Sequence, residues 1–292
     1  IKMITKKNLL YNFIFRASTD KKIRTYYHLL EPLFHSMSDN NMYLNLGYHY
    51  TDRSFPSSVV KTQINMVEKV TSEFKRSGIW LDAGCGTGAP ACHLAKMHKQ
   101  VQIEGINIVE SQIVKARSLA KKVDLINSAK FFFGDAQFIE REEEYFQNIY
   151  AIESAFHFAN KKKFIQESFR TLKNDGSIAI ADIVLRPELA SPIDFYKIAI
   201  AKHGLATKEF YSSEKWKHLL DTSGFRNITI EDITINVASV LPEWINLIRF
   251  NEEKLLKLYP KLFLDMLCKC LQYAVDKNEK SLFGYVIVRA EK

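Results

Sequence analysis

Three glycines at alternate positions, Gly84, Gly86 and Gly88, constrain this chain of 292 residues more than any other feature. A short apolar segment precedes them and ends in the acid Asp82. Glycine lets the backbone turn tightly and lets a ligand approach where a Cβ atom would block it. Pro90 then suits the first turn of a helix. Because a glycine-rich turn from strand to helix holds nucleotide cofactors in many doubly wound folds, the sequence predicts a cofactor site here.

Strand-like and helix-like segments alternate along the chain from residue 78. The predicted strands are 78–83, 101–107, 129–133, 147–152 and 177–184. The predicted helices between them are 90–98, 110–121, 138–144 and 161–172. Such alternation argues for an α/β fold with a doubly wound, mostly parallel sheet covered on both faces. Two later β-prone segments, 225–236 and 282–289, bring the expected Rossmann-like sheet to seven strands.

Helical segments outside this alternation form the expected additions to the sheet. They are predicted at 20–35, 56–76, 193–203, 213–222 and 242–277. We therefore expect four parts, in chain order an N-terminal helical cover, a cofactor-binding core, a late core strand with helical lid insertions, and a final core strand. Their expected boundaries are 1–76, 77–185, 186–280 and 281–292.

Charge and hydropathy exclude some classes of function. The net charge of +8 permits attraction to acidic partners, but the basic residues are spread along the chain. The longest Lys/Arg run, 161–163, is expected on the solvated start of a helix, so nucleic acid is not the expected partner. No run of 18 apolar residues is present, so no membrane span is expected. The first residues carry lysines without a small-residue cleavage site, so we expect a cytoplasmic protein.

The four cysteines, Cys85, Cys92, Cys268 and Cys270, show neither CxxC spacing nor a metal-site pattern. Buried free thiols are the expected state in a cytosolic protein. We therefore expect no metal site. A homodimer is compatible with the sequence, which does not determine the oligomeric state.

Two cofactor classes compete for the glycine turn. The residues Gly84-Cys-Gly86-Thr-Gly88-Ala89 formally satisfy the GxGxxG/A pattern of dinucleotide enzymes. That pattern also needs an Asp or Glu about 20 residues further on, at the end of the second strand, to bind the ribose diol. Asn107 occupies that place, and Asp82 has no counterpart in the dinucleotide pattern. An NAD-dependent oxidoreductase is therefore disfavoured.

Several stretches together resemble class I S-adenosylmethionine-dependent methyltransferases. Leu81-Asp-x-Gly-x-Gly-x-Gly88 resembles their motif I. Gly105-Ile-Asn-Ile-Val-Glu-Ser-Gln112 resembles the second-strand motif of small-molecule enzymes related to the tocopherol and rebeccamycin sugar methyltransferases. Gly134-Asp-Ala-Gln137 is similar to the adenine-binding turn, and Glu153-Ser-Ala-Phe-His-Phe158 to the segment that ends the fourth strand. Gly284-Tyr-Val-Ile-Val288 fits their antiparallel last strand, so the resemblance covers roughly residues 20 to 292.

The resemblance implies S-adenosyl-L-methionine as cofactor and S-adenosyl-L-homocysteine as its product. The glycine turn would face the methionine part, with Asp82 near its ammonium group. Asn107 and Gln112 would share the ribose hydroxyls, since an amide both donates and accepts hydrogen bonds. The remaining cofactor-binding residues that it implies are Ile108, Asp135, Ala136, Glu153, Tyr27 and Tyr48.

Within that set, Asp135 would accept the adenine amino group while the Ala136 backbone meets the ring. The backbone carbonyl of Glu153 would meet the amino group of the cofactor, and the two tyrosines would close over it. Purely structural roles stay open: turn capping for Asp82, solvation for Gln112, a helix N-cap for Asp135 and core packing for Tyr27 and Tyr48.

Methyl transfer from a sulfonium needs alignment and exclusion of water, and a general base only if the acceptor arrives protonated. His157 follows the fourth strand and is the base candidate, with a hydrogen-bonded structural histidine as the alternative. Asp182 ends the predicted fifth strand and is the second catalytic candidate, with turn capping as its alternative. Phe156 stands where the cyclopropane fatty acid synthases, which this segment also resembles, have Glu.

We therefore expect a methyltransferase acting on a small hydrophobic or aromatic acceptor. The methyl group goes to oxygen, nitrogen or carbon, and the base candidate favours oxygen. A protein or nucleic-acid methyltransferase is the first competing hypothesis, but its Asn/Asp-Pro-Pro-Tyr motif is replaced here by Glu153-Ser-Ala-Phe. An NAD-dependent oxidoreductase and a non-catalytic cofactor-binding protein are two further hypotheses, both less favoured.

Overall fold

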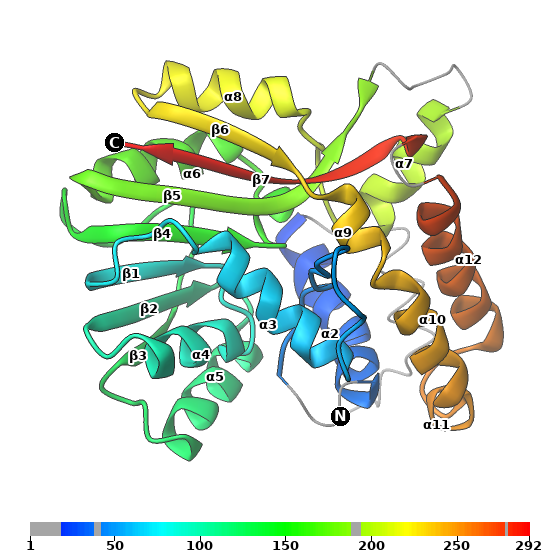
Figure 1. Cartoon of the computed structure of the whole chain (residues 1–292). Coiled ribbons are helices and arrows are strands. Elements are labelled where there is room, and N and C mark those ends of the chain that lie inside the picture. The colour runs from blue at the N-terminus through cyan, green and yellow to red at the C-terminus, as the bar shows by residue number, and fades with distance from the viewer. Residues whose placement is uncertain (1–18, 38–41, 188–193, 278–279) are drawn as a thin grey trace.

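The computed structural model describes residues 19–37, 42–187, 194–277 and 280–292. At its centre lies a seven-stranded sheet with the order β3-β2-β1-β4-β5-β7-β6. The strands are β1 (Gly78–Ala83), β2 (Val101–Asn107), β3 (Ala129–Phe133), β4 (Phe146–Ile152), β5 (Leu172–Leu185), β6 (Arg226–Asp232) and β7 (Phe283–Glu291). Neighbouring strands are parallel, except that β7 runs antiparallel to β5 and β6 (Figure 1). The predicted fold class, with its antiparallel last strand, is confirmed.

The central strands are buried on both faces because helices cover the sheet from both sides. Consecutive side chains of a strand point to opposite faces. Thus Trp80 and Tyr150 pack in the core beneath helices α3 (Val59–Val70), α4 (Ala89–Met97) and α5 (Glu110–Lys122). Leu81 and Ile149 pack in the opposite core beneath α6 (Lys161–Thr171) and α8 (Ser213–Thr222). Near-continuous apolar runs are what such doubly covered parallel strands require.

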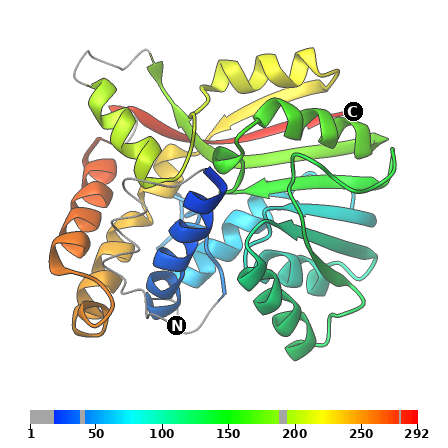
Figure 2. The same cartoon turned by 180° about the vertical axis from the view of Figure 1, so that it is seen from behind.

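The added helices gather beside the carboxyl ends of the parallel strands. They are α2 (Thr19–Met37), α7 (Asp194–Gly204), α9 (Thr234–Ala238), α10 (Leu241–Phe250), α11 (Glu252–Leu256) and α12 (Lys261–Lys277). Seen from behind, α2 (dark blue) stands beside those strand ends, while α6 (green) and α8 (yellow) lie over the sheet (Figure 2). None of the helices in the described ranges is long and apolar enough to cross a membrane.

The helix predicted over 138–144 does not form in the described stretch 42–187. The backbone there turns instead, with Phe138 N–H donating to Asp135 O at 2.9 Å. The guanidinium of Arg170, from α6, donates to the carbonyls of Ile139 and Arg141 at 2.9 and 2.8 Å. The prediction was wrong because a side chain distant in sequence satisfies carbonyls that a helix would have used itself.

Two later segments also differ from expectation. The strand predicted over 225–236 ends at Asp232, because its carboxylate accepts the Thr234 N–H at 2.9 Å and α9 begins there. The helical stretch predicted over 242–277 is three helices, separated at Asn251 and again before Pro260, which cannot continue a helix from its preceding turn.

Candidate functional site

A pocket opens at the carboxyl ends of β1 to β4, with α2 above it. It holds about 890 Å³ of space, part of which is open to solvent. Most of the residues predicted for the site line it together. They are Tyr27, Asp82, Gly84, Gly86, Asn107, Ile108, Gln112, Asp135, Ala136, Glu153 and His157. Gly88, Tyr48 and Asp182 do not line it.

Left-handed backbone conformations explain the three glycines of the turn. Their φ angles are +84°, +51° and +82° for Gly84, Gly86 and Gly88. A Cβ atom at Gly84 would lie 2.5 Å from Ser154 Cβ, and one at Gly88 would lie 2.7 Å from Phe131 Cζ. At Gly86 the nearest atom, Leu44 Cδ1, would lie 3.3 Å away. Gly84 and Gly88 therefore allow close packing, whereas Gly86 leaves backbone exposed to the pocket.

Asp82 presents a buried carboxyl group to this turn. It is 3% exposed, and within the described residues its Oδ2 atom has no hydrogen-bond partner. Burial raises its pKa to about 7, an effect that the nearby Tyr150 hydroxyl partly offsets. An unpaired buried carboxyl group is costly unless a cation pairs with it. The position therefore suits a cationic ligand group.

The amides of Asn107 and Gln112 form a pair at the pocket wall. Asn107 Nδ2 donates to Gln112 Oε1 at 2.7 Å, and Asn107 Oδ1 accepts the Val109 N–H at 3.3 Å. Gln112 is fully buried, so the alternative of a solvated helix residue is wrong. Within the described residues its Nε2 has no hydrogen-bond partner. The pair thus offers a free N–H donor on Gln112 and a carbonyl acceptor on Asn107, which together can bind the two hydroxyl groups of a diol.

Asp135 and Ala136 lie on the loop after β3. The Asp135 carboxylate accepts from the backbone N–H and the side-chain amide of Gln137, at 2.9 Å each. The next described element is β4, not a helix, so a helix N-cap is not the role of Asp135. Gln137 also lines the pocket, and its Oε1 accepts the Asn160 N–H at 2.6 Å. The adjoining turn is therefore tied to the start of α6.

Glu153 connects the end of β4 to the segment above the pocket. Its backbone has a φ of +51°, an uncommon value for a residue with a side chain. Its carboxylate accepts the Leu46 N–H at 2.7 Å. Burial raises its pKa to about 7, and the Leu46 N–H and Tyr285 partly offset that rise. The side chain of Glu153 thus links the end of β4 to the backbone at Leu46.

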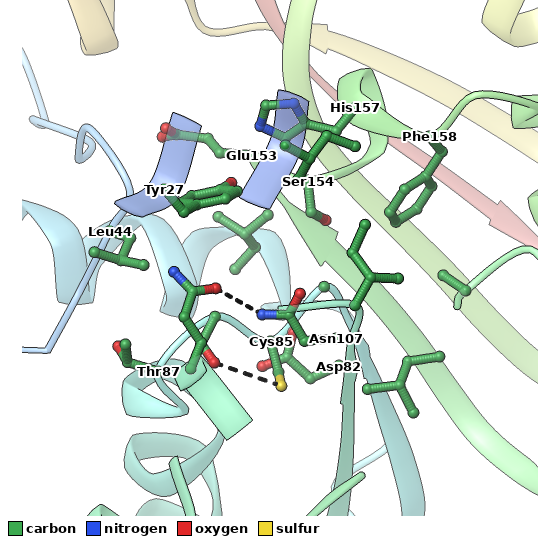
Figure 3. A pocket seen from close by; sticks show the side chains of 18 of the residues that line it. Tyr27, Leu44, Asp82, Cys85, Thr87, Asn107, Glu153, Ser154, His157 and Phe158 are labelled. Carbon is green, nitrogen blue, oxygen red and sulfur yellow. Dashed lines mark hydrogen bonds between the residues drawn. The ribbon is translucent and has the colours of Figure 1, made fainter. Parts of the chain in front are cut away.

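His157 lies in an aromatic enclosure at one end of the pocket. Its ring centroid is 5.2 Å from that of Tyr26, 5.4 Å from Tyr27 and 3.9 Å from Phe156. The side chain is 3% exposed, and neither ring nitrogen makes a hydrogen bond of normal geometry within the described residues. Burial lowers its pKa to about 3, against the opposing effect of the backbone at Ala206 and Leu205, so the imidazole is neutral at pH 7. Figure 3 shows Tyr27, Glu153 and His157 at the same end of the pocket.

Two predicted residues lie elsewhere. Asp182 was expected at the end of the fifth strand, but β5 continues to Leu185, so Asp182 is paired with Val286 inside the sheet. Tyr48 is 5% exposed and packs edge-on against Tyr50, at 4.9 Å between ring centroids. Core packing, rather than closure over the pocket, describes the position of Tyr48.

Sequence reasoning missed part of the lining. The missed residues include Ile23, Met42, Leu44, Asn45, Thr87, Ser154 and Phe158. Ser154 Oγ donates to Ala83 O at 2.6 Å and so joins the end of β4 to that of β1. The segment 42–45 carries no periodicity that would place it over the sheet, and the hydrogen bond between Leu46 and Glu153 spans 107 residues.

Helix α2 forms the roof of the pocket through Ile23 and Tyr27. Glu31, which is buried in the same helix, forms an ion pair with Lys115 of α5. The Tyr259 hydroxyl donates to the carbonyl of Leu29, which ties the roof to the segment between α11 and α12. The roof is therefore anchored from two sides.

These residues fit S-adenosylmethionine. Asp82 offers an unpaired carboxyl oxygen for the ammonium, Gln112 and Asn107 offer a donor and an acceptor for the ribose, and Gly86 offers open backbone. No group of three or more metal-ligating side chains occurs among the residues that the structure describes.

Comparisons with known proteins agree with this fit. The O-methyltransferase resE of Aspergillus sclerotiorum is 29% identical over 254 residues, covering 86% of this chain and 89% of that protein. The (+)-O-methylkolavelool synthase of Herpetosiphon aurantiacus is 26% identical over 245 residues, covering 82% of each chain. The cyclopropane synthase MmaA2 of Mycobacterium tuberculosis shares the fold, with a TM-score of 0.81 at 13% identity, covering 95% of this chain and 100% of that one.

A family model described as a methyltransferase domain matches residues 74–228. The finer resemblance to the tocopherol and rebeccamycin sugar enzymes stays a prediction. Because the model spans more than half of the chain, the chain belongs to this family and is a class I S-adenosylmethionine-dependent methyltransferase.

Proposed function

We propose that this enzyme methylates an oxygen atom of a small, largely apolar organic acceptor, and that His157 receives the hydroxyl proton. The observation that carries the proposal is the aromatic enclosure, in which a neutral imidazole lines the pocket and makes no hydrogen bond of normal geometry among the described residues. The printed names of two relatives contain O-methyl, which supports oxygen as the reacting atom.

The cofactor contacts proposed here follow the donor and acceptor pattern of the pocket. Asp82 pairs with the ammonium group, and the exposed backbone at Gly86 lies along the methionine part. Gln112 Nε2 donates to a ribose hydroxyl, while Asn107 Oδ1 accepts from one. Asp135, Ala136 and Ile108 line the adenine end, where the Asp135 carboxylate has lone pairs left beyond those used by Gln137.

Bound S-adenosylmethionine supplies a methyl group on a positively charged sulfur, with a neutral thioether as the leaving group. His157 accepts a hydrogen bond from the acceptor hydroxyl and holds its oxygen toward the pocket. The depressed pKa of His157 makes the imidazole a weak base. An oxygen that gains a methyl group while still protonated is a strong acid, however, so its proton passes even to a weak base. His157 then returns the proton to solvent when the site opens.

The acceptor proposed is small and apolar because of what surrounds the free space. Ile23, Met42, Leu44, Ile152 and Phe158 all contribute apolar side chains to the lining. The roof helix α2 lies over the pocket, which favours a small acceptor over a folded macromolecule. A small hydrophobic alcohol or phenol matches these walls and the neutral proton acceptor among them.

Turnover with a panel of terpenoid alcohols and phenols tests the proposal, with S-adenosyl-L-homocysteine formation as the readout. We expect product with at least one alcohol or phenol, and kcat lowered on the order of a hundredfold by His157→Ala. The affinity for S-adenosyl-L-homocysteine, measured by calorimetry, should stay within twofold. Unchanged kcat in His157→Ala would remove the base role, and methylation of amines alone would refute oxygen as the target.

A further inference from the structure

Lys161 is buried although it opens the most basic run of the chain. Residues 161–163 were expected on a solvated helix start, and α6 does begin at Lys161. Lys162 is exposed as expected, but Lys161 is only 4% exposed. Lysine is almost never fully buried unless its ammonium group is paired or hydrogen-bonded. The burial of Lys161 therefore calls for a reason.

The ammonium group of Lys161 holds the two carbonyls that flank His157. Lys161 Nζ donates to Phe156 O at 3.0 Å and to Phe158 O at 3.2 Å. These residues stand immediately before and after His157, in the short helical turn η1 (Ala155–His157) and its last cap. This bridge fixes the peptide group that leads into His157 and a second one that begins one residue after it, so the short segment that carries the imidazole is held at both ends.

Thr207 provides a second donor to the carbonyl of Phe156. Its hydroxyl donates to Phe156 O, and also lies 3.2 Å from Glu209 O. A turn of three residues has too few internal hydrogen bonds to hold its own geometry. One donor from the start of α6, close in sequence, and one from the loop after α7, about fifty residues later, therefore hold η1 in place.

Asp182 of β5 interacts electrostatically with Lys161, although no ion pair joins them in the described part of the chain. It is 1% exposed, its Oδ1 accepts the Ile183 N–H at 2.9 Å, and within the described residues its Oδ2 makes no hydrogen bond of normal geometry. Burial raises the pKa of Asp182 well above its ordinary value, and the Lys161 charge opposes that rise. Asp182 in turn opposes the fall in the pKa of Lys161. Each group therefore lowers the cost of burying the other.

We propose that Lys161 is a positioning residue for His157, fixing the carbonyls of the residues before and after it so that the imidazole is aimed into the pocket. This inference rests on the proposed function, in which His157 meets the acceptor. Orientation to within a fraction of an ångström is what such support contributes to a reaction.

The charges around His157 agree with this arrangement. Tyr26 and Tyr27 contact it from α2 and Lys161 acts on it from α6, while Asp182 and Glu153 act on Tyr27. Burial is the main cause of the low pKa of His157, and the Lys161 charge lowers that pKa further.

Lys161→Met tests the proposal against Lys162→Met, the matched control one residue away on the exposed side. We expect Lys161→Met to lower kcat on the order of tenfold to a hundredfold, with the affinity for S-adenosyl-L-homocysteine within twofold of wild type. Lys162→Met should leave both unchanged. Wild-type kcat in folded Lys161→Met would overturn the proposal.

A double-mutant cycle separates positioning from general support. In a His157→Ala background, Lys161→Met should lower kcat no further, because the residue that it positions is gone. A full, additive loss would show that Lys161 acts on the fold rather than through His157, and would overturn the inference. If Lys161→Met does not fold, Thr207→Val removes the second donor to Phe156 O and should lower kcat in the same non-additive way.

A measurement that does not depend on catalysis distinguishes failure of the proposed function from failure of the positioning role of Lys161. In protein labelled with ¹³C-histidine, with the signal assigned by His157→Ala, Lys161→Met should move the His157 ring signal and Lys162→Met should not. If this shift is seen while His157→Ala keeps full activity, the proposed function fails and the contact between Lys161 and the His157 turn stands. If the signal does not move, the positioning role is refuted.

Discussion

Asn107 and Gln112 bind each other, with Nδ2 of the first 2.7 Å from Oε1 of the second. The bond orients both amides, so that Gln112 Nε2 is a buried donor without a partner among the described residues. An acid at this place would accept from both hydroxyls of a ribose, whereas this pair can accept from one and donate to the other. We therefore propose that the site binds the ribose diol without adding negative charge near Asp82.

Gln112→Leu should weaken cofactor binding while keeping the fold, because leucine is close in volume but has no amide. We expect the dissociation constant for S-adenosyl-L-homocysteine to rise about tenfold, which corresponds to about 1.4 kcal/mol. Calorimetry on Gln112→Leu and on Val114→Ala, an exposed position on the same helix, checks this. Equal affinity in the two variants would contradict the diol contact.

Cofactor affinity should rise with pH through the neutral range because of Asp82. Its pKa is about 7 in the free protein, and a bound ammonium group favours the ionised form. Binding below pH 7 must therefore release a proton, and affinity should increase by up to about tenfold per pH unit until the raised pKa is passed. Calorimetry at pH 6 and pH 8, in buffers of different ionisation enthalpy, measures both quantities.

Asp82→Asn should bind more weakly at pH 8 and lose most of the proton release. Glu153→Gln is the matched comparison, because burial raises the pKa of Glu153 to about 7 as well. Its carboxylate accepts from Leu46 rather than from a ligand, so the pH dependence should persist in Glu153→Gln. If Glu153→Gln loses the proton release and Asp82→Asn keeps it, the acid that titrates on binding is Glu153 and the prediction for Asp82 is wrong.

The buried neutral His157 should cost stability in acid. Its pKa is about 3 when folded, below the ordinary value, so the unfolded chain binds more protons between pH 3 and about 6.5. Wild type should therefore lose about 1.4 kcal/mol per pH unit relative to His157→Phe as pH falls below 6.5. Urea unfolding of both proteins at pH 7, 6 and 5 measures the difference, and a constant difference would refute it.

Substitutions at Gly84 and Gly86 should differ in how much they lower the free energy of unfolding. Gly84→Ala meets Ser154 and strains a left-handed backbone, so the free energy of unfolding should fall by roughly 3 kcal/mol. Gly86→Ala has only Leu44 within contact, so its loss should be about 1–2 kcal/mol from backbone strain. Thermal unfolding should show that Gly86→Ala is more stable than Gly84→Ala. Calorimetry should show that Gly86→Ala nevertheless binds S-adenosyl-L-homocysteine more weakly than the wild type does.

The cofactor end of the pocket was predictable from sequence because its residues sit at strand ends. An apolar run such as β1 can be recognised by itself, and parallel strands bring their carboxyl ends to one edge of the sheet. Asp82, Asn107 and Asp135 therefore reached one pocket, as expected. Because each of these residues lies at or just after the end of a strand, each could be assigned to the site from its own short segment of sequence.

The rest depended on contacts that no sequence pattern records. Lys161 looked like a surface lysine because the basic run gives no sign that the carbonyls three and five residues before it turn toward the ammonium group. Asp182 was expected at the end of the fifth strand. It lies inside β5 instead, because β5 extends to Leu185 through its pairing with β7, about a hundred residues later. Such long-range pairings decide burial, and neither periodicity nor spacing records them.

The anchored roof has a kinetic consequence. Because the ion pair between Glu31 and Lys115 joins α2 to α5, Ile23 and Tyr27 are held over the cavity, and the route that remains for the spent donor is the part of the pocket that is open to solvent. A substitution that breaks this ion pair would loosen the cover without touching any reacting atom.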